Sequence, residues 1–126
     1  MKKAIILGVL LVLLIAAGVS EHYFVHKTFD EFNGRLKELE TAIDTENLEA
    51  ALEQTKNLDS WWEKKRSILE VISYCPDMRQ INVIIGEMQG SLEYEDFQNA
   101  SSKVISLLKL IDNIEDILDF NAKDVI

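Results

Sequence analysis

The sequence contains one cysteine, one proline and only five glycines in 126 residues. Because Cys75 has no second cysteine to pair with, no intramolecular disulfide can form, and stability must come from packing. Two of the glycines, Gly8 and Gly18, lie in an N-terminal apolar run, so the rest of the chain has no flexible linker and no low-complexity segment. We therefore expect one small domain after that run.

Basic residues are also scarce, with 13 Lys and Arg against 22 Asp and Glu and a formal net charge of −9. Without Lys2 and Lys3 the chain has 22 acidic and 11 basic residues, a net charge of −11. Such a surface repels phosphate backbones, which excludes nucleic-acid binding as a main role. Phosphate loops, zinc quartets and nucleophile elbows are missing as well, so we expect no enzyme, no cofactor and no metal.

The longest apolar run is Ala4–Val19, sixteen residues preceded by Lys2 and Lys3. A membrane-spanning helix needs about 20 apolar residues, with roughly 17 as the lower limit, whereas the apolar part of a signal peptide has about 7 to 15. The small residues Ala16–Gly18 could precede a signal-peptidase cleavage site. Apolar character resumes at Tyr23–Val25, which favours an uncleaved anchor with an aromatic residue at the interface.

We therefore predict a signal anchor over residues 1–20 and an extracytoplasmic domain over residues 21–126 in the cell membrane. No cysteine directly follows the run, which excludes a lipoprotein anchor. Lys2 and Lys3 place the N-terminus in the cytoplasm by the positive-inside rule. The last part of the chain carries too many charges for a second span, so the chain crosses at most once. A secreted protein, formed by cleavage, is the alternative.

Four later segments carry apolar residues at alternating steps of three and four, the spacing of an amphipathic helix. They lie at 25–43, 48–74, 78–92 and 97–118. The first two stripes are Val25, Phe29, Phe32, Leu36, Leu39 and Ile43, and Leu48, Leu52, Leu58, Trp62, Leu69 and Ile72. The third stripe is Met78, Ile81, Ile85, Met88 and Leu92. The fourth is Phe97, Ala100, Val104, Leu107, Ile111, Ile114 and Leu118, and it is widened by Ile105, Leu108 and Ile117.

Three breaks separate these helices. The capping-type residues 44–47 end the first helix, and residues 91–94 are expected to form the last turn. Pro76 marks the middle break, because the preceding Cys75 is disfavoured in helical backbone. Asp77 is expected just inside the first turn of the third helix, where it favours the positive helix end.

A faint internal repeat relates the two halves of the domain at a shift of 49 residues. The shift superimposes the stripe 29–43 on 78–92, and it also superimposes the turn 44–51 on 93–100. Because 49 is seven heptads, the turns are the better evidence. We predict an all-α fold: a single N-terminal transmembrane helix followed by an up-down four-helix bundle of two helical hairpins.

The candidate functional residues form one basic and aromatic segment in the second helix: Trp61, Trp62, Lys64, Lys65 and Arg66. If the first helix rises from the membrane for about 20 residues and the second descends antiparallel to it, this segment returns near the level of the lipid headgroups. Two indoles and three cations suit an anionic surface or an acidic partner. The alternative is that Trp62 belongs to the core and the cations form a solvated face.

Other residues carry weaker signals. His22 and His26 share one helix face and could hold a metal, or respond to pH below about 6.5, but no third ligand has a fixed spacing. The acids Glu93, Glu95 and Asp96 lack the spacing of a calcium loop and are expected to complement a helix N-terminus.

Cys75 could act as a nucleophile or form an intermolecular disulfide, but a buried thiol is commonly a small apolar side chain. No histidine is placed in the sequence to suggest a catalytic partner for it. Packing is therefore the simplest role for Cys75.

The segment Trp61-Trp62-Glu63-Lys64-Lys65, followed by Leu69, Ile72, Met78 and Ile81, resembles a family of short bacterial proteins catalogued as a domain of unknown function. The resemblance implies a single-span, all-helical extracytoplasmic protein, often encoded beside another small membrane protein, with no assigned activity. Where the family has a His-x-Glu-Leu turn and an Asn-Ile-Leu-like tail, this chain has Cys75 and Asp77 and ends in 123–126.

These observations lead to one functional hypothesis and its alternatives. We expect a non-enzymatic, membrane-anchored helical protein that binds and supports or regulates another membrane or envelope protein. The alternatives are an extracytoplasmic sensor or ligand-binding bundle, a lipid-surface structural protein, and a secreted helical protein. A homo-oligomer is compatible with each of them.

Overall fold

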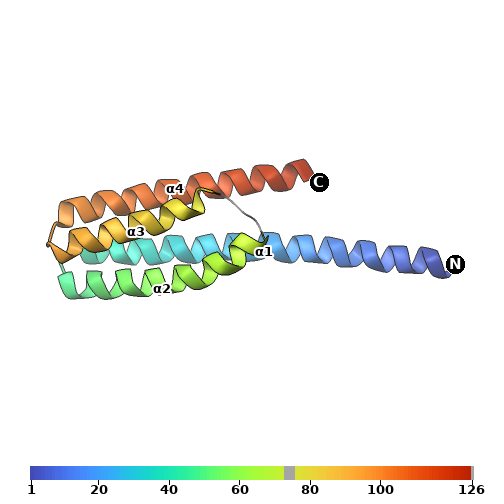
Figure 1. Cartoon of the computed structure of the whole chain (residues 1–126), viewed down its shortest axis with the longest axis horizontal. Coiled ribbons are helices and arrows are strands. Elements are labelled where there is room, and N and C mark those ends of the chain that lie inside the picture. Colours follow the sequence, from blue (N-terminus) through green and yellow to red (C-terminus); the bar gives the residue numbers. More distant parts are fainter. Residues whose placement is uncertain (73–75, 126) are drawn as a thin grey trace.

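The computed structural model describes the backbone of residues 1–72 and 76–125, and the side chains of these residues apart from 72 and 119–125. The described residues form four helices and no strand: α1 (Lys2–Asp44), α2 (Leu48–Ile72), α3 (Met78–Glu93) and α4 (Phe97–Val125). α1 and α3 each pack against α2 and α4, which closes a ring of four helices. Successive helices run in opposite directions (Figure 1), so the bundle has the predicted up-down arrangement.

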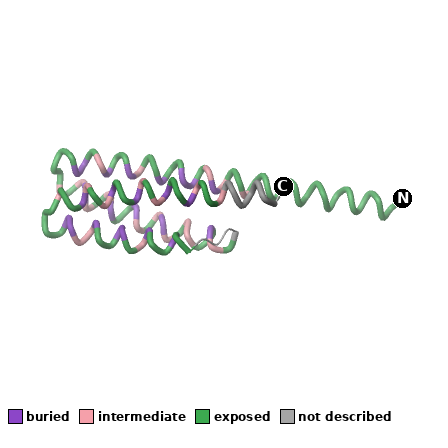
Figure 2. The backbone as a smooth tube through the Cα atoms, turned by 90° about the horizontal axis from the view of Figure 1, so that it is seen from above, coloured by how far each residue is buried: buried purple, intermediate pink, exposed green. Residues whose placement is uncertain are grey.

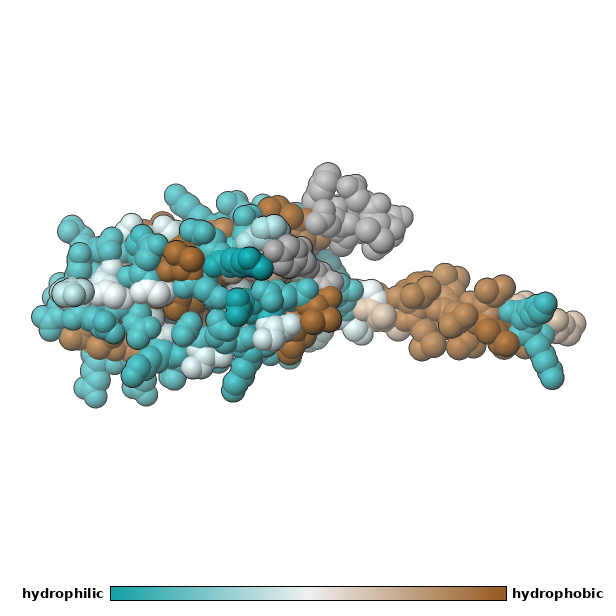
Figure 3. All heavy atoms as spheres, viewed as in Figure 1, coloured by the Kyte–Doolittle hydropathy of each residue, from teal (hydrophilic) through white to brown (hydrophobic). Residues whose placement is uncertain are grey.

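The apolar run and the first bundle helix are a single helix. α1 has 43 residues, a length of about 65 Å at 1.5 Å per residue. Residues 2–20 of this helix are all exposed (Figure 2). Val25 is its first buried residue. Within the described residues, α1 alone is long and apolar enough to cross a membrane. Figure 3 shows the apolar segment as a brown column that projects from a largely hydrophilic bundle.

Three of the four predicted stripes are confirmed by burial. Every stripe residue of α1 and α3 is buried, and in α4 the stripe is buried except at its half-buried ends, Phe97 and Leu118. Ile105 and Ile117, which were expected to widen the α4 stripe, are instead exposed. They lie beside the a/d positions, where only a helix with neighbours on three sides would cover them.

The predicted inner face of α2 is incomplete at its start, because it omits two buried residues. Ala51 and Thr55 are buried there, whereas Leu48 and Leu52 are only half-buried. Size and polarity made the leucines the stronger sequence signal, but the register set by Leu58 and Trp62 points Ala51 and Thr55 inward. Thr55 is tolerated because its hydroxyl donates to the Ala51 carbonyl at 2.7 Å. Ile72 and Tyr74, also assigned to this helix, lie outside the residues whose side chains are described.

Two predicted boundaries shift by a few residues. Ser91 was placed in the last turn but is helical and buried, and its hydroxyl donates to the Glu87 carbonyl at 3.0 Å. The turn therefore begins at Tyr94. Asp77 was placed inside α3 but is its N-cap residue, with Met78 the first helical residue.

The turn between α1 and α2 reverses the chain with few residues. Glu46 has a φ of 54°, in the left-handed region. The N–H of Glu46 donates to Ile43 at 3.0 Å, and the N–H of Asn47 donates to Ala42 at 2.9 Å, which is the Schellman pattern of a helix end. The Asn47 Oδ1 accepts from the Ala50 N–H at 3.2 Å, so Asn47 also caps α2.

The turn between α3 and α4 repeats every one of these features 49 residues later. Glu95 has a φ of 58°, its N–H donates to Leu92 at 3.0 Å, and the N–H of Asp96 donates to Ser91 at 2.8 Å. The Asp96 Oδ1 accepts from the Asn99 N–H at 3.1 Å. The predicted repeat is thus confirmed in the backbone. Both turns lie at the end of the bundle away from the N-terminus (Figure 1).

Candidate functional site at the base of the bundle

We define the base of the bundle as the end next to residues 1–20. The predicted basic and aromatic segment lies between the middle of α2 and this base (Figure 1). The two tryptophans of this segment differ in burial. Trp62 is fully buried, with ring centroids 5.2 Å from Phe32 and 6.4 Å from Phe29. Its indole Nε1 has no acceptor among the described residues, so the ring acts through packing. Trp62 is a core residue.

Trp61 is half-buried and covers the edge of the core. It packs edge-to-face on Phe32 at a centroid distance of 5.5 Å. The Arg35 guanidinium lies 5.0 Å from the Trp61 ring centroid, a cation–π distance. Trp61 therefore joins α1 to α2 and presents only part of its indole to the outside.

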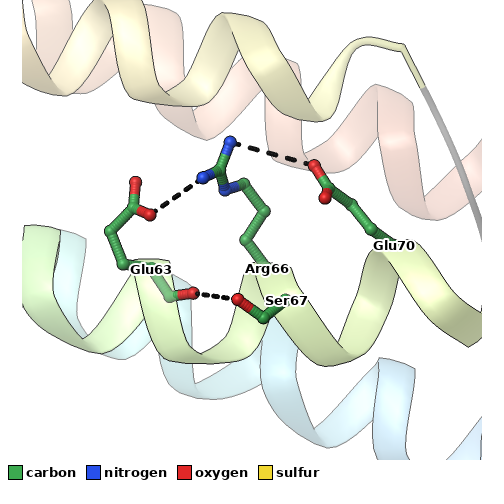
Figure 4. A network of polar contacts seen from close by, with 4 residues as sticks. All are labelled: Glu63, Arg66, Ser67 and Glu70. Atoms are coloured by element: carbon green, nitrogen blue, oxygen red, sulfur yellow. Dashed lines mark hydrogen bonds and ion pairs between the residues drawn. The ribbon is translucent and has the colours of Figure 1, made fainter.

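The three cations of the segment also differ in their surroundings. Arg66 lies between two carboxylates, 2.9 Å from Glu63 and 3.8 Å from Glu70 (Figure 4). Lys65 is half-buried, with its Nζ 5.4 Å from the Phe24 ring centroid. Lys64 is exposed. The charge available to a partner is therefore smaller than the sequence suggests, because Arg66 is locally neutralised.

A second set of residues at the base combines Tyr23 and Phe24, which the sequence indicated as interfacial, with residues for which it gave no such signal. An open hollow of about 720 Å³ lies between α1 and the end of α2. It is lined by Ala17, Ser20, Glu21, Tyr23, Phe24, Lys27 and Val71. The Lys27 Nζ lies 6.0 Å from the Tyr23 ring centroid. The spacing of Tyr23 and Lys27, four residues apart on a helix, could have indicated their pairing, but nothing in the sequence places Val71 beside them.

The two histidines lie on the opposite side of α1, towards α4. Their ring centroids are 4.4 Å apart in an edge-to-face arrangement. The His26 Nδ1 is 3.9 Å from the Glu115 Oε2, which links α1 to α4. Among the described residues no three or more His, Cys, Asp and Glu side chains come together in a way that could hold a metal ion.

The remaining candidates divide between the far end of the bundle and the undescribed residues. Glu93, Glu95 and Asp96 are exposed at the α3–α4 turn, where Asp96 caps α4 as expected for an acid at a helix N-terminus. Cys75, for which packing or a disulfide was predicted, lies outside the described residues.

Comparison with known proteins identifies a family but no characterised relative. The chain matches a protein family described as a domain of unknown function, DUF4363, over residues 19–125. No curated protein and no solved structure matches the chain. The resemblance to a family of unknown function, expected from the sequence, is confirmed at this level.

Proposed function

This chain belongs to the DUF4363 family, and from that premise we propose that it is a non-enzymatic, single-pass protein of the cell membrane whose four-helix bundle binds another membrane or envelope protein. In this proposal the bundle lies outside the cytoplasm, and its binding supports or regulates the partner. The observation that carries the proposal is the continuity of α1 from the apolar segment into the core.

The apolar segment supports an anchor because the bundle does not cover it. Residues 1–20 are exposed throughout, and they include eleven large apolar side chains from Ile5 to Val19. A contiguous apolar surface of more than a few hundred Å² marks a site of contact with a membrane or a protein. A helix of this length and composition suits a lipid bilayer.

The orientation follows from charge. Lys2 and Lys3 precede the apolar run, and the bundle that follows it is strongly acidic. A cationic end is retained in the cytoplasm by the positive-inside rule. The proposal therefore places the bundle on the outer side.

The reach of the bundle supports a partner in or next to the same membrane. No linker separates the apolar segment from the bundle, since both lie in α1. The bundle part of α1 spans residues 25–44, a height of about 30 Å. A rigid domain of that height can contact only proteins within a few nanometres of the bilayer, and it offers exposed apolar side chains at Val83 and Ile105 for such a contact.

Site-specific photo-crosslinking in native membranes tests the partner. A photoreactive residue is placed in the full chain at Val83 or Ile105, and at the exposed Glu38 and Glu53 as matched controls on α1 and α2. We expect the same membrane or envelope protein to be crosslinked repeatedly. The yield of this adduct should be high at a position in the interface and low at positions on other faces of the bundle. Monomer alone at all four positions would contradict the proposal.

Mass spectrometry of the mature chain tests the anchor. An uncleaved anchor leaves a chain that begins at Met1 or Lys2. A chain that begins near Val19 would mean that the protein is secreted, and the membrane part of the proposal would be wrong.

A further inference from the structure

The end of α2 descends to the level of the apolar segment. Val71 lines the same hollow as Ala17 and Ser20 of α1. The hydrocarbon core of a bilayer is about 30 Å thick, which a straight helix crosses in about 20 residues. A span that starts at Ala4 therefore ends near Tyr23, and Val71 lies at the height of the last turn of that span.

We propose that the base of the bundle is inserted into the headgroup layer of the bilayer along its α1–α2 edge, with phospholipid as the occupant of the hollow. The proposal rests on the membrane anchor of the proposed function and adds a lipid-binding surface to it. We call this surface the interfacial edge and define it by Tyr23, Lys27, Lys64, Ile68 and Val71.

The exposure of the apolar side chains fits this position. Val71 is 87% exposed, Tyr23 66% and Ile68 46%. Ile68 and Val71 are three residues apart and share one side of α2. Side chains of this kind are costly in water but are favoured where headgroups meet hydrocarbon, and tyrosine in particular is enriched there. Figure 3 shows apolar side chains at the end of the bundle beside the apolar column.

The cations of the edge are placed where phosphate groups would lie. Lys27 follows Tyr23 by one helical turn, about 6 Å further from the hydrocarbon. Lys64 is exposed one helical turn before Ile68 on α2. Lys65, next to the edge, adds a further ammonium over the Phe24 ring. A lysine with its stem along an apolar surface and its ammonium at the phosphates is the usual arrangement at an interface.

The insertion also accounts for the short apolar run. Sixteen residues span only about 24 Å, roughly a turn short of the hydrocarbon thickness. Tyr23 and Phe24 of α1, with Val71 of α2, supply apolar surface over the missing turn. The opposite edge is less suited to phospholipid, because Asp112, Glu115 and Asp116 of α4 are acidic.

Fluorescence quenching of single-cysteine variants of the full chain tests the proposal. On a Cys75→Ser background, cysteine is introduced at Val71 or Ile68. The matched controls are Val83→Cys and Ile105→Cys, since these side chains are 50% and 49% exposed but lie on α3 and α4 away from the edge. Leu11→Cys reports on the anchor itself. Each variant is labelled with bimane and reconstituted into vesicles of phosphatidylcholine and phosphatidylglycerol.

The readouts are quenching by a lipid with a nitroxide high on its acyl chain and quenching by aqueous iodide. We expect several-fold stronger lipid quenching at Val71 than at Val83 and at Ile68 than at Ile105, with iodide in the reverse order. Equal lipid quenching within both pairs, with Leu11 still quenched by lipid, would overturn the insertion and leave the anchor intact. Loss of lipid quenching at Leu11 as well would overturn the anchor. Protection of Val71 from both quenchers would mean that protein covers the edge, which also overturns the proposal.

Discussion

The left-handed residues in the two distal turns give the sharpest test of the bundle. Glu46 and Glu95 have φ values of 54° and 58°. Glycine adopts this left-handed conformation most readily, because glycine has no Cβ atom. Both side chains are exposed. Replacing either with glycine should therefore relieve backbone strain without removing a buried contact.

The gain can be estimated from two opposing terms. The left-handed conformation costs an L-residue about 1–2 kcal/mol, and glycine removes this cost. Glycine also raises the conformational entropy of the unfolded chain, and this opposes the gain by about 0.5–1 kcal/mol. We expect Glu46→Gly and Glu95→Gly each to raise the free energy of unfolding by about 0.5–1 kcal/mol. For a domain of about 100 residues this raises the Tm by roughly 2–8 °C.

The measurement is thermal unfolding of the full chain in detergent micelles, followed by circular dichroism. Glu46→Ala is the matched control, because it removes the same carboxylate but keeps the Cβ atom, and it should give no such gain. Glu53→Gly, at an exposed helical position, should lower the free energy of unfolding by about 1 kcal/mol, because glycine has a low helix propensity. Since each turn acts through its own backbone, the double glycine variant should gain the sum of the single gains.

Two results would refute the reasoning. If the alanine variant gains as much as the glycine variant, the effect is one of charge on an acidic surface and not of backbone strain. If glycine stabilises one turn and destabilises the other, the two turns do not share the conformation that the repeat requires.

Three further predictions concern α2 and are measured by chemical denaturation of the full chain in micelles. Trp62→Ala should lower the free energy of unfolding by about 3–5 kcal/mol, because it empties a fully buried site. Trp61→Ala should lower it by only about 1 kcal/mol. Equal losses would contradict the assignment of Trp62 to the core and of Trp61 to its edge. Arg66→Gln should lower the free energy of unfolding by less than about 1 kcal/mol, because both of its ion pairs lie within α2 and are partly exposed. A larger loss would mean that Arg66 also stabilises a contact outside its own helix. Thr55→Val should leave the free energy of unfolding within about 1 kcal/mol of that of the parent chain, because the hydroxyl donates only to a carbonyl of its own helix. A large loss of stability would reveal a further role for the hydroxyl.

Much of the fold could be predicted because the sequence repeats its signals. The stripe from Val25 to Ile43 has large apolar residues at nearly every inward position, so its period is unambiguous. The acid-rich turns resemble each other at a shift of 49 residues, and the structure gives Glu46 and Glu95 the same backbone conformation. Where an inward position carries a small or polar residue, as at Ala51 and Thr55, period alone could not identify the core.

The surroundings of the candidate site were harder to predict, because several of its side chains contact residues of α1. The sequence identified Trp61–Arg66 as unusual, but it could not tell that Trp62 is covered by Phe29 and Phe32. The spacing of Glu63, Arg66 and Glu70 on a helix allows their ion pairs, but the sequence could not tell that Lys65 lies over the Phe24 ring, because that contact depends on the packing of α2 on α1.

The sequence by itself therefore determined the helices, the turns, the acidic surface and the apolar segment, because each depends on local composition and period. Only the tertiary structure decided that Val71 of α2 reaches the level of Ala17 and Ser20 of α1. That juxtaposition depends on the lengths and register of two antiparallel helices, and it joins residues about fifty positions apart. No local pattern encodes it.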